Sequence, residues 1–167
     1  MRIYPLLLFG SLLATAALLV SVLSADLPEI VAVHFNAAGV ANGFMTRADC
    51  RSFMLAFTLG APAFVALVTG LVPRLLPASM INIPNRDYWL APARARESIA
   101  FLSEQGIWFA CILLIFLACV DWMLAKANES SPADLPAARF GWMMAAFAVA
   151  IAVWALRMFR RFRRVQR

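Results

Sequence analysis

The segment FMLAFTLGAPAFVALVTGLV, residues 53–72, carries no charge over 20 positions. A helix needs about 20 mostly apolar residues to cross a hydrocarbon layer roughly 30 Å thick. Residues 3–23 also meet this length without a charge, and residues 105–120 and 140–156 meet it once flanking residues are included. The sequence therefore predicts an all-α membrane protein with four transmembrane helices, at about 3–24, 52–72, 101–124 and 140–158.

The composition leaves no room for a separate soluble domain. Of the 167 residues, 63% are hydrophobic, whereas soluble domains contain about 45–50% apolar residues. We therefore expect residues 1–167 to form a single membrane domain. The first span could also be a cleaved signal peptide, because Val22, Leu23 and Ser24 resemble a cleavage site. Its apolar core exceeds the usual length of about 7–15 residues, which favours a retained span.

The distribution of arginines predicts which side each loop faces. Cytoplasmic segments near a membrane are enriched in Lys and Arg. With a cytoplasmic N-terminus, eleven basic residues lie on the inner side and four on the outer side. We expect a multi-pass protein of the bacterial inner (plasma) membrane with both termini in the cytoplasm. An ordered extracytoplasmic loop then spans residues 25–45, and an inner loop spans residues 73–95.

The C-terminal segment, residues 157–167, is the most basic part of the chain. Each arginine near an anionic leaflet contributes roughly 1 kcal/mol of binding free energy. The segment is therefore expected to lie on anionic lipid headgroups, with a membrane or cytoplasmic protein as the alternative partner; nucleic acid is not expected. The lipid-facing arginines of this basic tail are Arg157, Arg160, Arg161, Arg163 and Arg164.

Several residues inside the spans predict how the helices pack. Pro62 interrupts the second span and favours a kink there. The pairs Ala56–Gly60 and Gly106–Ala110 have the small-xxx-small spacing that lets helices approach closely in lipid. Among the acidic residues, Glu104 and Asp121 fall at the margins of the third span, where both could reach headgroups. With no charge at the centre of a span, the sequence argues against an ion-coupled transporter.

The outer loop reads ADLPEIVAVHFNAAGVANGFM, residues 25–45. Alternation of apolar and other residues over 31–35 predicts a short extended segment. Gly39 and the dipeptide Asn42-Gly43 both predict turns. Thr46 followed by Asp49 forms a capping-box pattern, which predicts that the second helix begins just after the loop. The loop is therefore expected to be ordered.

The same loop resembles the domain of unknown function at the N-terminus of SdpI-type membrane proteins, over roughly residues 5–72. That resemblance implies a non-enzymatic membrane protein that acts in immunity to a secreted toxin and in signalling to a cytoplasmic repressor. The chain departs from the family pattern at Val31-Ala32 and Asn42. The basic residue that the family has after the aromatic is Arg47 in this chain. The matching residues are Leu27, Pro28, His34, Phe35, Asn36, Gly39, Gly43 and Phe44.

His34 is the single histidine of the chain. It could make structural hydrogen bonds, which we favour, or act as a ligand or as a pH sensor between about pH 5 and 8. No ligand spacing typical of zinc sites is present, so neither a metal nor any other cofactor is expected. The candidate functional residues of the outer loop are His34, Phe35, Asn36, Gly39, Asn42, Gly43 and Phe44.

The inner loop, residues 73–95, contains prolines that oppose a continuous helix. It also holds a compact polar and aromatic group, the inner-face group, which could anchor the loop at the headgroup level or dock a cytoplasmic partner. This block, IPNRDYWLAP, resembles a segment of longer relatives of the SdpI-type proteins. The members of the inner-face group are Asn85, Arg86, Asp87, Tyr88 and Trp89.

Three functions remain open on the sequence alone. The first is an SdpI-like envelope protein for immunity or signalling, and the second is an accessory subunit that packs against a larger membrane complex. The third is a membrane enzyme that uses His34 with Asp49 or Glu29, which requires these side chains within about 3 Å of a reacting atom. No catalytic motif is present in the sequence, so a non-enzymatic function is favoured.

Overall fold

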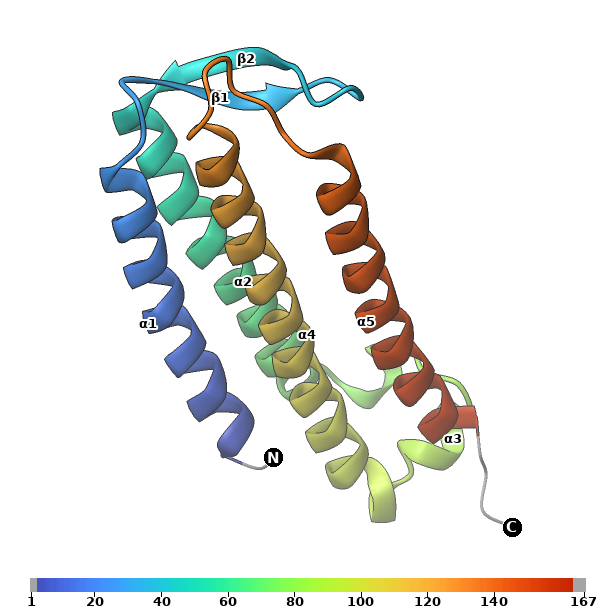
Figure 1. Ribbon diagram of the computed structural model, residues 1–167. Coiled ribbons are helices and arrows are strands. Elements are labelled where there is room, and N and C mark those ends of the chain that lie inside the picture. The colour runs from blue at the N-terminus through green and yellow to red at the C-terminus, as the bar shows by residue number, and fades with distance from the viewer. Residues whose placement is uncertain (1–2, 164–167) are drawn as a thin grey trace.

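The computed structural model describes residues 3–163 and contains four long helices that run side by side (Figure 1). They are α1 (Tyr4–Ala25), α2 (Arg47–Leu75), α4 (Pro92–Ala127) and α5 (Ala137–Arg163). All four are long and apolar enough to cross a membrane, as expected for a multi-pass membrane protein. The start of α1 and the end of α5 lie at the same end of the bundle (Figure 1).

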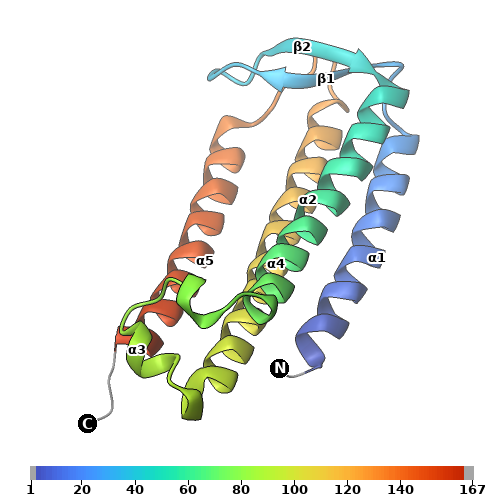
Figure 2. The same ribbon diagram turned by 180° about the vertical axis from the view of Figure 1, so that it is seen from behind.

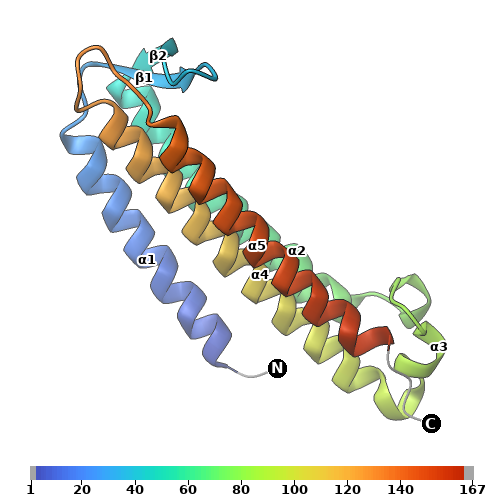
Figure 3. The ribbon, with the colours of Figure 1, turned by 45° about the vertical axis from the view of Figure 1, so that its right-hand side comes forward.

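Each end of the bundle carries a short additional element. Strands β1 (Ile30–Phe35) and β2 (Ala41–Thr46) form a hairpin across one end, which we call the hairpin end. The 3-10 helix η1 (Ala78–Met80) and the one-turn helix α3 (Arg86–Trp89) lie at the other, the α3 end, beside the end of α5 (Figure 3).

Helix α4 is the centre of the bundle. It contacts α1, α2 and α5, whereas α5 packs chiefly against α4. Seen from behind, α5 stands apart from α1, with α2 and α4 between them (Figure 2). The helix has 36 residues, which corresponds to a length of about 54 Å at 1.5 Å per residue. It is therefore longer than a hydrocarbon layer of about 30 Å requires.

The hairpin corrects the all-α prediction. Its strands are antiparallel, with Ile30 paired to Thr46 and Phe35 paired to Ala41. The extended segment at 31–35 is confirmed as part of β1. The prediction of a turn at Asn42-Gly43 was wrong, because both residues lie inside β2. The chain reverses before them, between the strands, where Gly39 has a φ of +84°.

The second helix begins where the capping box predicts. Thr46 is its N-cap, and its Oγ1 accepts a hydrogen bond from the backbone N–H of Asp49 at 3.2 Å. The Oγ1 hydroxyl also donates to Asp49 Oδ2 at 2.7 Å. This arrangement satisfies one of the N–H groups that a helix start leaves without a partner, so α2 begins at Arg47, before the apolar run.

Close packing between α2 and α4 occurs at one of the two predicted small-residue pairs. A Cβ on Gly106 would lie 2.6 Å from Thr69 Cβ, and Ala110 is fully buried. Gly60 and Ala56 are both exposed, and a Cβ on Gly60 would meet nothing within 4 Å. The prediction is confirmed for Gly106–Ala110 and wrong for Ala56–Gly60, because that side of α2 faces away from its neighbours.

The prediction that Asp121 reaches the headgroups was also wrong. Its side chain lies inside the bundle, 6% exposed, where it accepts a hydrogen bond from Thr58 of α2. Glu104 behaves differently, because it accepts a long hydrogen bond of 3.4 Å from the Tyr4 hydroxyl at the α3 end.

Candidate functional site

The turn of the hairpin is built around Asn36. Its Oδ1 accepts hydrogen bonds from the backbone N–H groups of Ala38 at 2.9 Å and Val40 at 3.0 Å. Its backbone N–H donates to the Val40 carbonyl, and its own carbonyl accepts from Gly39, both at 2.9 Å. Asn side chains favour turns because they bond to nearby backbone groups in this way. Asn36 therefore has a structural role in the loop motif.

His34 and Asn42 face each other across the two strands. His34 Nδ1 and Asn42 Oδ1 are hydrogen-bonded, as the structural interpretation of the histidine predicts. Gly43 lies beside this pair, and a Cβ there would sit 2.8 Å from His34 Cβ. The missing side chain of Gly43 therefore makes room for the histidine, while Phe44, one residue later, is 60% exposed.

Asn128, at the end of α4, ties the hairpin to the bundle. Its Oδ1 accepts from the Ala32 N–H at 2.8 Å and its Nδ2 donates to the Ala32 carbonyl at 2.9 Å. The same Nδ2 also donates to the Leu124 carbonyl at 2.9 Å. The amide thus satisfies both backbone groups of a buried strand residue, as a third strand would. No local sequence pattern predicts this role of Asn128.

The tip of the hairpin is joined to the segment between α4 and α5. The Leu135 N–H donates to the Gly39 carbonyl at 3.0 Å, and Val40 forms a bridge with Asp134. A Cβ on Gly39 would collide with the Leu135 carbonyl oxygen. Glycine is therefore required here both for its positive φ and for this close approach.

A cavity of about 520 Å³ lies beneath the hairpin. Ligand sites in proteins commonly have volumes of about 300–1,000 Å³ and mostly apolar walls with a few polar groups. Here His34, Phe35 and Asn36 come from the hairpin, Leu124 from α4, and Phe140 and Gly141 from α5. The His-Phe-Asn motif therefore lies at an apolar cavity with two polar side chains at its wall.

The structure does not bring together the residues of the enzyme hypothesis. Asp49 is engaged by Thr46 in the helix cap. Glu29 lines a different hollow, beside Thr46 and Arg47, from the one that His34 lines. Among residues 3–163, no group of three or more His, Cys, Asp or Glu side chains could hold a metal ion. His34, Glu29 and Asp49 therefore have different surroundings in the structure.

At the α3 end, two members of the inner-face group hold the end of α5. Asn85 Nδ2 and Trp89 Nε1 donate to the Phe162 carbonyl at 2.8 Å and 3.0 Å. The last carbonyls of a helix lack partners within the helix, so these donors cap α5. Asn85 itself adopts a left-handed conformation, with φ +53°.

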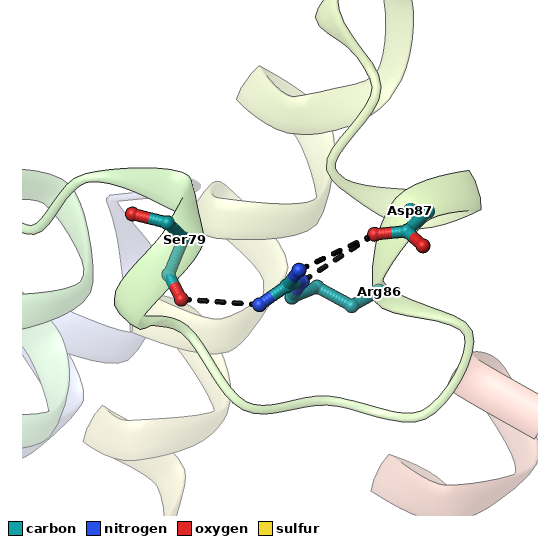
Figure 4. Close-up of polar contacts among 3 residues, drawn as sticks. All are labelled: Ser79, Arg86 and Asp87. Carbon is teal, nitrogen blue, oxygen red and sulfur yellow. Dashed lines mark hydrogen bonds and ion pairs between the residues drawn. The ribbon is translucent and has the colours of Figure 1, made fainter.

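The other members of the inner-face group make local contacts. Arg86 donates to the Ser79 carbonyl at 3.1 Å and lies 3.5 Å from an Asp87 carboxylate oxygen (Figure 4). Arg94 stacks over the Tyr88 ring, with its guanidinium carbon 3.8 Å from the ring centre. The Asp87 side chain remains 95% exposed. The group is thus divided between capping α5 and presenting charge at the surface.

The predicted basic tail is the last part of α5 as far as Arg163, and Arg164 lies outside the described residues. Arg157, Arg160 and Arg163 are exposed. Arg161 differs from the prediction that it faces lipid: it pairs with Glu97 of α4 at 2.6 Å and lies over the Phe101 ring. Helical geometry turns this one arginine toward α4.

The N-terminal part of the chain is similar to a known protein family. No curated protein and no solved structure matches the sequence. Residues 7–59, about a third of the chain, match the family model described as Domain of unknown function (DUF1648). The matched segment contains most of α1, the whole hairpin and the first turns of α2. The predicted resemblance is therefore confirmed: this part of the protein resembles the domain found at the N-terminus of SdpI-type proteins.

Proposed function

We propose that the protein is a non-enzymatic, SdpI-like protein of the bacterial plasma membrane that binds an apolar ligand beneath its hairpin, at the extracytoplasmic face. The observation that carries this proposal is the cavity of about 520 Å³ at the His-Phe-Asn motif. The DUF1648 match over the same hairpin supports it, because the resemblance to SdpI-type proteins implies a role in immunity to a secreted toxin.

The orientation rests on the distribution of charge. Eleven of the fifteen basic residues belong to segments at the α3 end or to the two termini, and four belong to segments at the hairpin end. Basic residues are enriched on the cytoplasmic side of membranes. The hairpin end then faces outward, where a secreted molecule meets it first.

The ligand is expected to be largely apolar with one or two hydrogen-bonding groups. Phe35, Leu124 and Phe140 supply apolar wall, while His34 and Asn36 supply the polar groups. A short apolar peptide has this chemistry. Binding it next to the membrane surface would keep it from the lipid bilayer, which is the physical basis of an immunity role.

Helix α5 offers a route for signalling across the membrane. Its first turns line the cavity through Phe140 and Gly141. Its last turn is capped by Asn85 and Trp89 at the α3 end. Helix α5 packs chiefly against α4. A ligand that displaces the first turns of α5 can therefore shift this helix with little disruption of the bundle. The inner-face group would then present a changed surface to a cytoplasmic regulator.

The test uses two glycines with open surroundings. A Cβ on Gly141 or on Gly60 would meet nothing within 4 Å, but Gly141 alone of the two lines the cavity. A deletion strain is exposed to apolar peptides secreted by its own and related bacteria, then complemented with wild type, Gly141→Phe or Gly60→Phe. We expect wild type and Gly60→Phe to restore resistance and Gly141→Phe to fail. A deletion without sensitivity, or full rescue by Gly141→Phe, contradicts the proposal.

An accessory subunit of a larger membrane complex is the second candidate. The observation that favours it is that no residue in the most apolar part of α5 is buried. Trp142, Val149 and Val153 on this helix are 77%, 63% and 61% exposed. Purification in mild detergent decides between the two candidate functions. The accessory subunit is favoured if a stoichiometric membrane partner copurifies and is lost when Val149 and Val153 are changed to Trp.

A further inference from the structure

A second hollow lies between α4 and α5, toward the α3 end and away from the hairpin. Its volume is about 340 Å³. Gln105 and Trp108 of α4 line one side, and Val153, Trp154 and Arg157 of α5 line the other. None of the residues that line it is acidic. The hollow therefore combines one cation, one amide and two indole rings between α4 and α5.

Gln105 is the unusual residue of this hollow. Its side chain is only 2% exposed, and its Nε2 has no hydrogen-bond partner among the described residues. Its backbone carbonyl is already engaged by Trp154 Nε1 at 3.0 Å. A buried amide without an acceptor is unfavourable, so such groups usually have a partner. Gln105 lines the hollow, so its amide needs only to turn toward the hollow for Nε2 to meet an acceptor bound there.

Arg157 supplies the charge. It is exposed, and within residues 3–163 it makes no ion pair with an acidic side chain. Its neighbour Arg161, by contrast, is paired with Glu97. An arginine guanidinium matches the oxygens of a phosphate group in geometry and charge. Arg157 and Gln105 Nε2 together form a donor set for an anionic group rich in acceptors.

The hollow continues as an apolar groove. A neighbouring hollow of about 230 Å³ shares Ile112 and Ala150 with it and reaches Cys119 and Met143. The distance along α4 from Gln105 to Cys119 corresponds to about 21 Å of helix rise. One leaflet contributes about half of the roughly 30 Å hydrocarbon layer, so an acyl chain whose headgroup lies at Arg157 can follow this groove.

We propose that this groove binds one anionic phospholipid. Its phosphate accepts hydrogen bonds from Gln105 Nε2 and Arg157, and an acyl chain lies along α4 and α5 past Ile112 and Ala150. A free phosphate or glycerol phosphate has the same anionic chemistry but would leave the apolar part of the groove empty. The site is separate from the cavity beneath the hairpin and does not depend on the function proposed for that cavity.

Binding to the full-length protein in a non-ionic detergent tests the proposal. Phosphatidylglycerol, phosphatidylcholine and glycerol phosphate are titrated separately, with native mass spectrometry and thermal unfolding as readouts. The variants are Arg157→Gln and Arg160→Gln, which remove the same charge from neighbouring exposed positions of α5. Arg160 lines neither hollow and is the matched control.

We expect phosphatidylglycerol to bind wild type and Arg160→Gln alike, and Arg157→Gln about tenfold more weakly. Phosphatidylcholine and glycerol phosphate should each bind at least tenfold more weakly than phosphatidylglycerol. An equal loss of phosphatidylglycerol binding in Arg157→Gln and Arg160→Gln would show that general charge attraction holds the lipid. That result would overturn the proposed site. Tight binding of glycerol phosphate alone would identify a soluble anion as the ligand and also overturn it.

Two further variants separate the two parts of the site. Ala150→Phe fills the groove at one of the two residues shared by both hollows, and it should abolish tight binding of phosphatidylglycerol. Gln105→Met removes the amide but keeps the length of the side chain, and it should weaken binding while leaving the fold intact. If both variants fold and bind as wild type does, the proposal is wrong.

Discussion

Thr58 of α2 donates a hydrogen bond of 2.6 Å from its hydroxyl to a carboxylate oxygen of Asp121 in α4. Both side chains are buried, with exposed fractions of 1% and 6%. The pair joins the two helices that pack most closely in the bundle. An acidic side chain inside a membrane protein is costly unless it faces the interior of the bundle and finds a partner, and Thr58 provides that partner.

Replacing Thr58 with Val keeps the shape of the side chain and removes the hydroxyl. Asp121 then loses its donor, and leaving a buried polar group unsatisfied costs about 1–3 kcal/mol. We expect Thr58→Val to lower the thermal unfolding temperature of the protein in detergent. The control is Thr15→Val at an exposed position of α1, where the hydroxyl bonds only to the Ser11 carbonyl of its own helix. Equal stability of the two variants would contradict the role assigned to the pair.

Gly106 and Gly60 should respond in opposite directions to the same substitution. Gly106→Ala places a Cβ 2.6 Å from Thr69 Cβ, so α2 and α4 must move apart and stability should fall. Gly60→Ala meets open space, and alanine in a helix interior is more stable than glycine by about 0.5–1 kcal/mol. Chemical unfolding of both variants in mixed micelles measures the difference. A change of stability in the same direction for both variants would show that the contact between α2 and α4 at Gly106 is not as close as described.

Asn128→Ala should loosen the hairpin without unfolding the helices. The Ala32 N–H and carbonyl, both bonded to Asn128, lose their partner. Hydrogen exchange of β1 amides should become faster, while amides in the middle of α4 stay protected. Lys126→Ala, which removes only an exposed pair with Glu129, is the control. Unchanged exchange in β1 would show that Asn128 does not hold the hairpin.

Trp89→Phe tests the cap on α5. The substitution keeps an aromatic ring against Phe162 and removes the indole N–H that donates to the Phe162 carbonyl. One hydrogen bond contributes about 0.5–1.5 kcal/mol, so stability should fall by about that amount. Proteolysis should also reach the end of α5 more readily. Trp142→Phe, at a residue 77% exposed, should change neither property.

Sequence patterns predicted the four helices because a long charge-free run has few alternatives to a span. They also predicted the start of α2, since Thr46 and Asp49 are close in the chain and cap locally. Gly106 was identified by spacing, but the same spacing at Gly60 was misleading. Spacing gives the face of a helix but does not say which face meets a neighbour.

Long-range contacts explain what the sequence could not predict. Asn128 lies 96 residues from Ala32, and an Asn after a helix has several common roles. The dipeptide Asn42-Gly43 favours a turn locally, but Asn36 builds the turn instead, and Gly43 is needed opposite His34. Asp121 was expected to face the headgroups, but the direction of its side chain depends on Thr58, which belongs to another helix. The cavity beneath the hairpin likewise depends on α5, which the loop sequence does not contain.

The proposed function requires the hairpin to lie outside the cell and the α3 end to lie inside. Phe44, 60% exposed on the hairpin, and Asp87, with a side chain 95% exposed at the α3 end, are suitable reporter positions. Each is changed to Cys in a variant that lacks Cys50, Cys111 and Cys119, and intact cells are treated with a membrane-impermeant thiol reagent. The account predicts labelling of Phe44→Cys in intact cells and of Asp87→Cys only after permeabilisation. The reverse pattern, or labelling of both in intact cells, would contradict it.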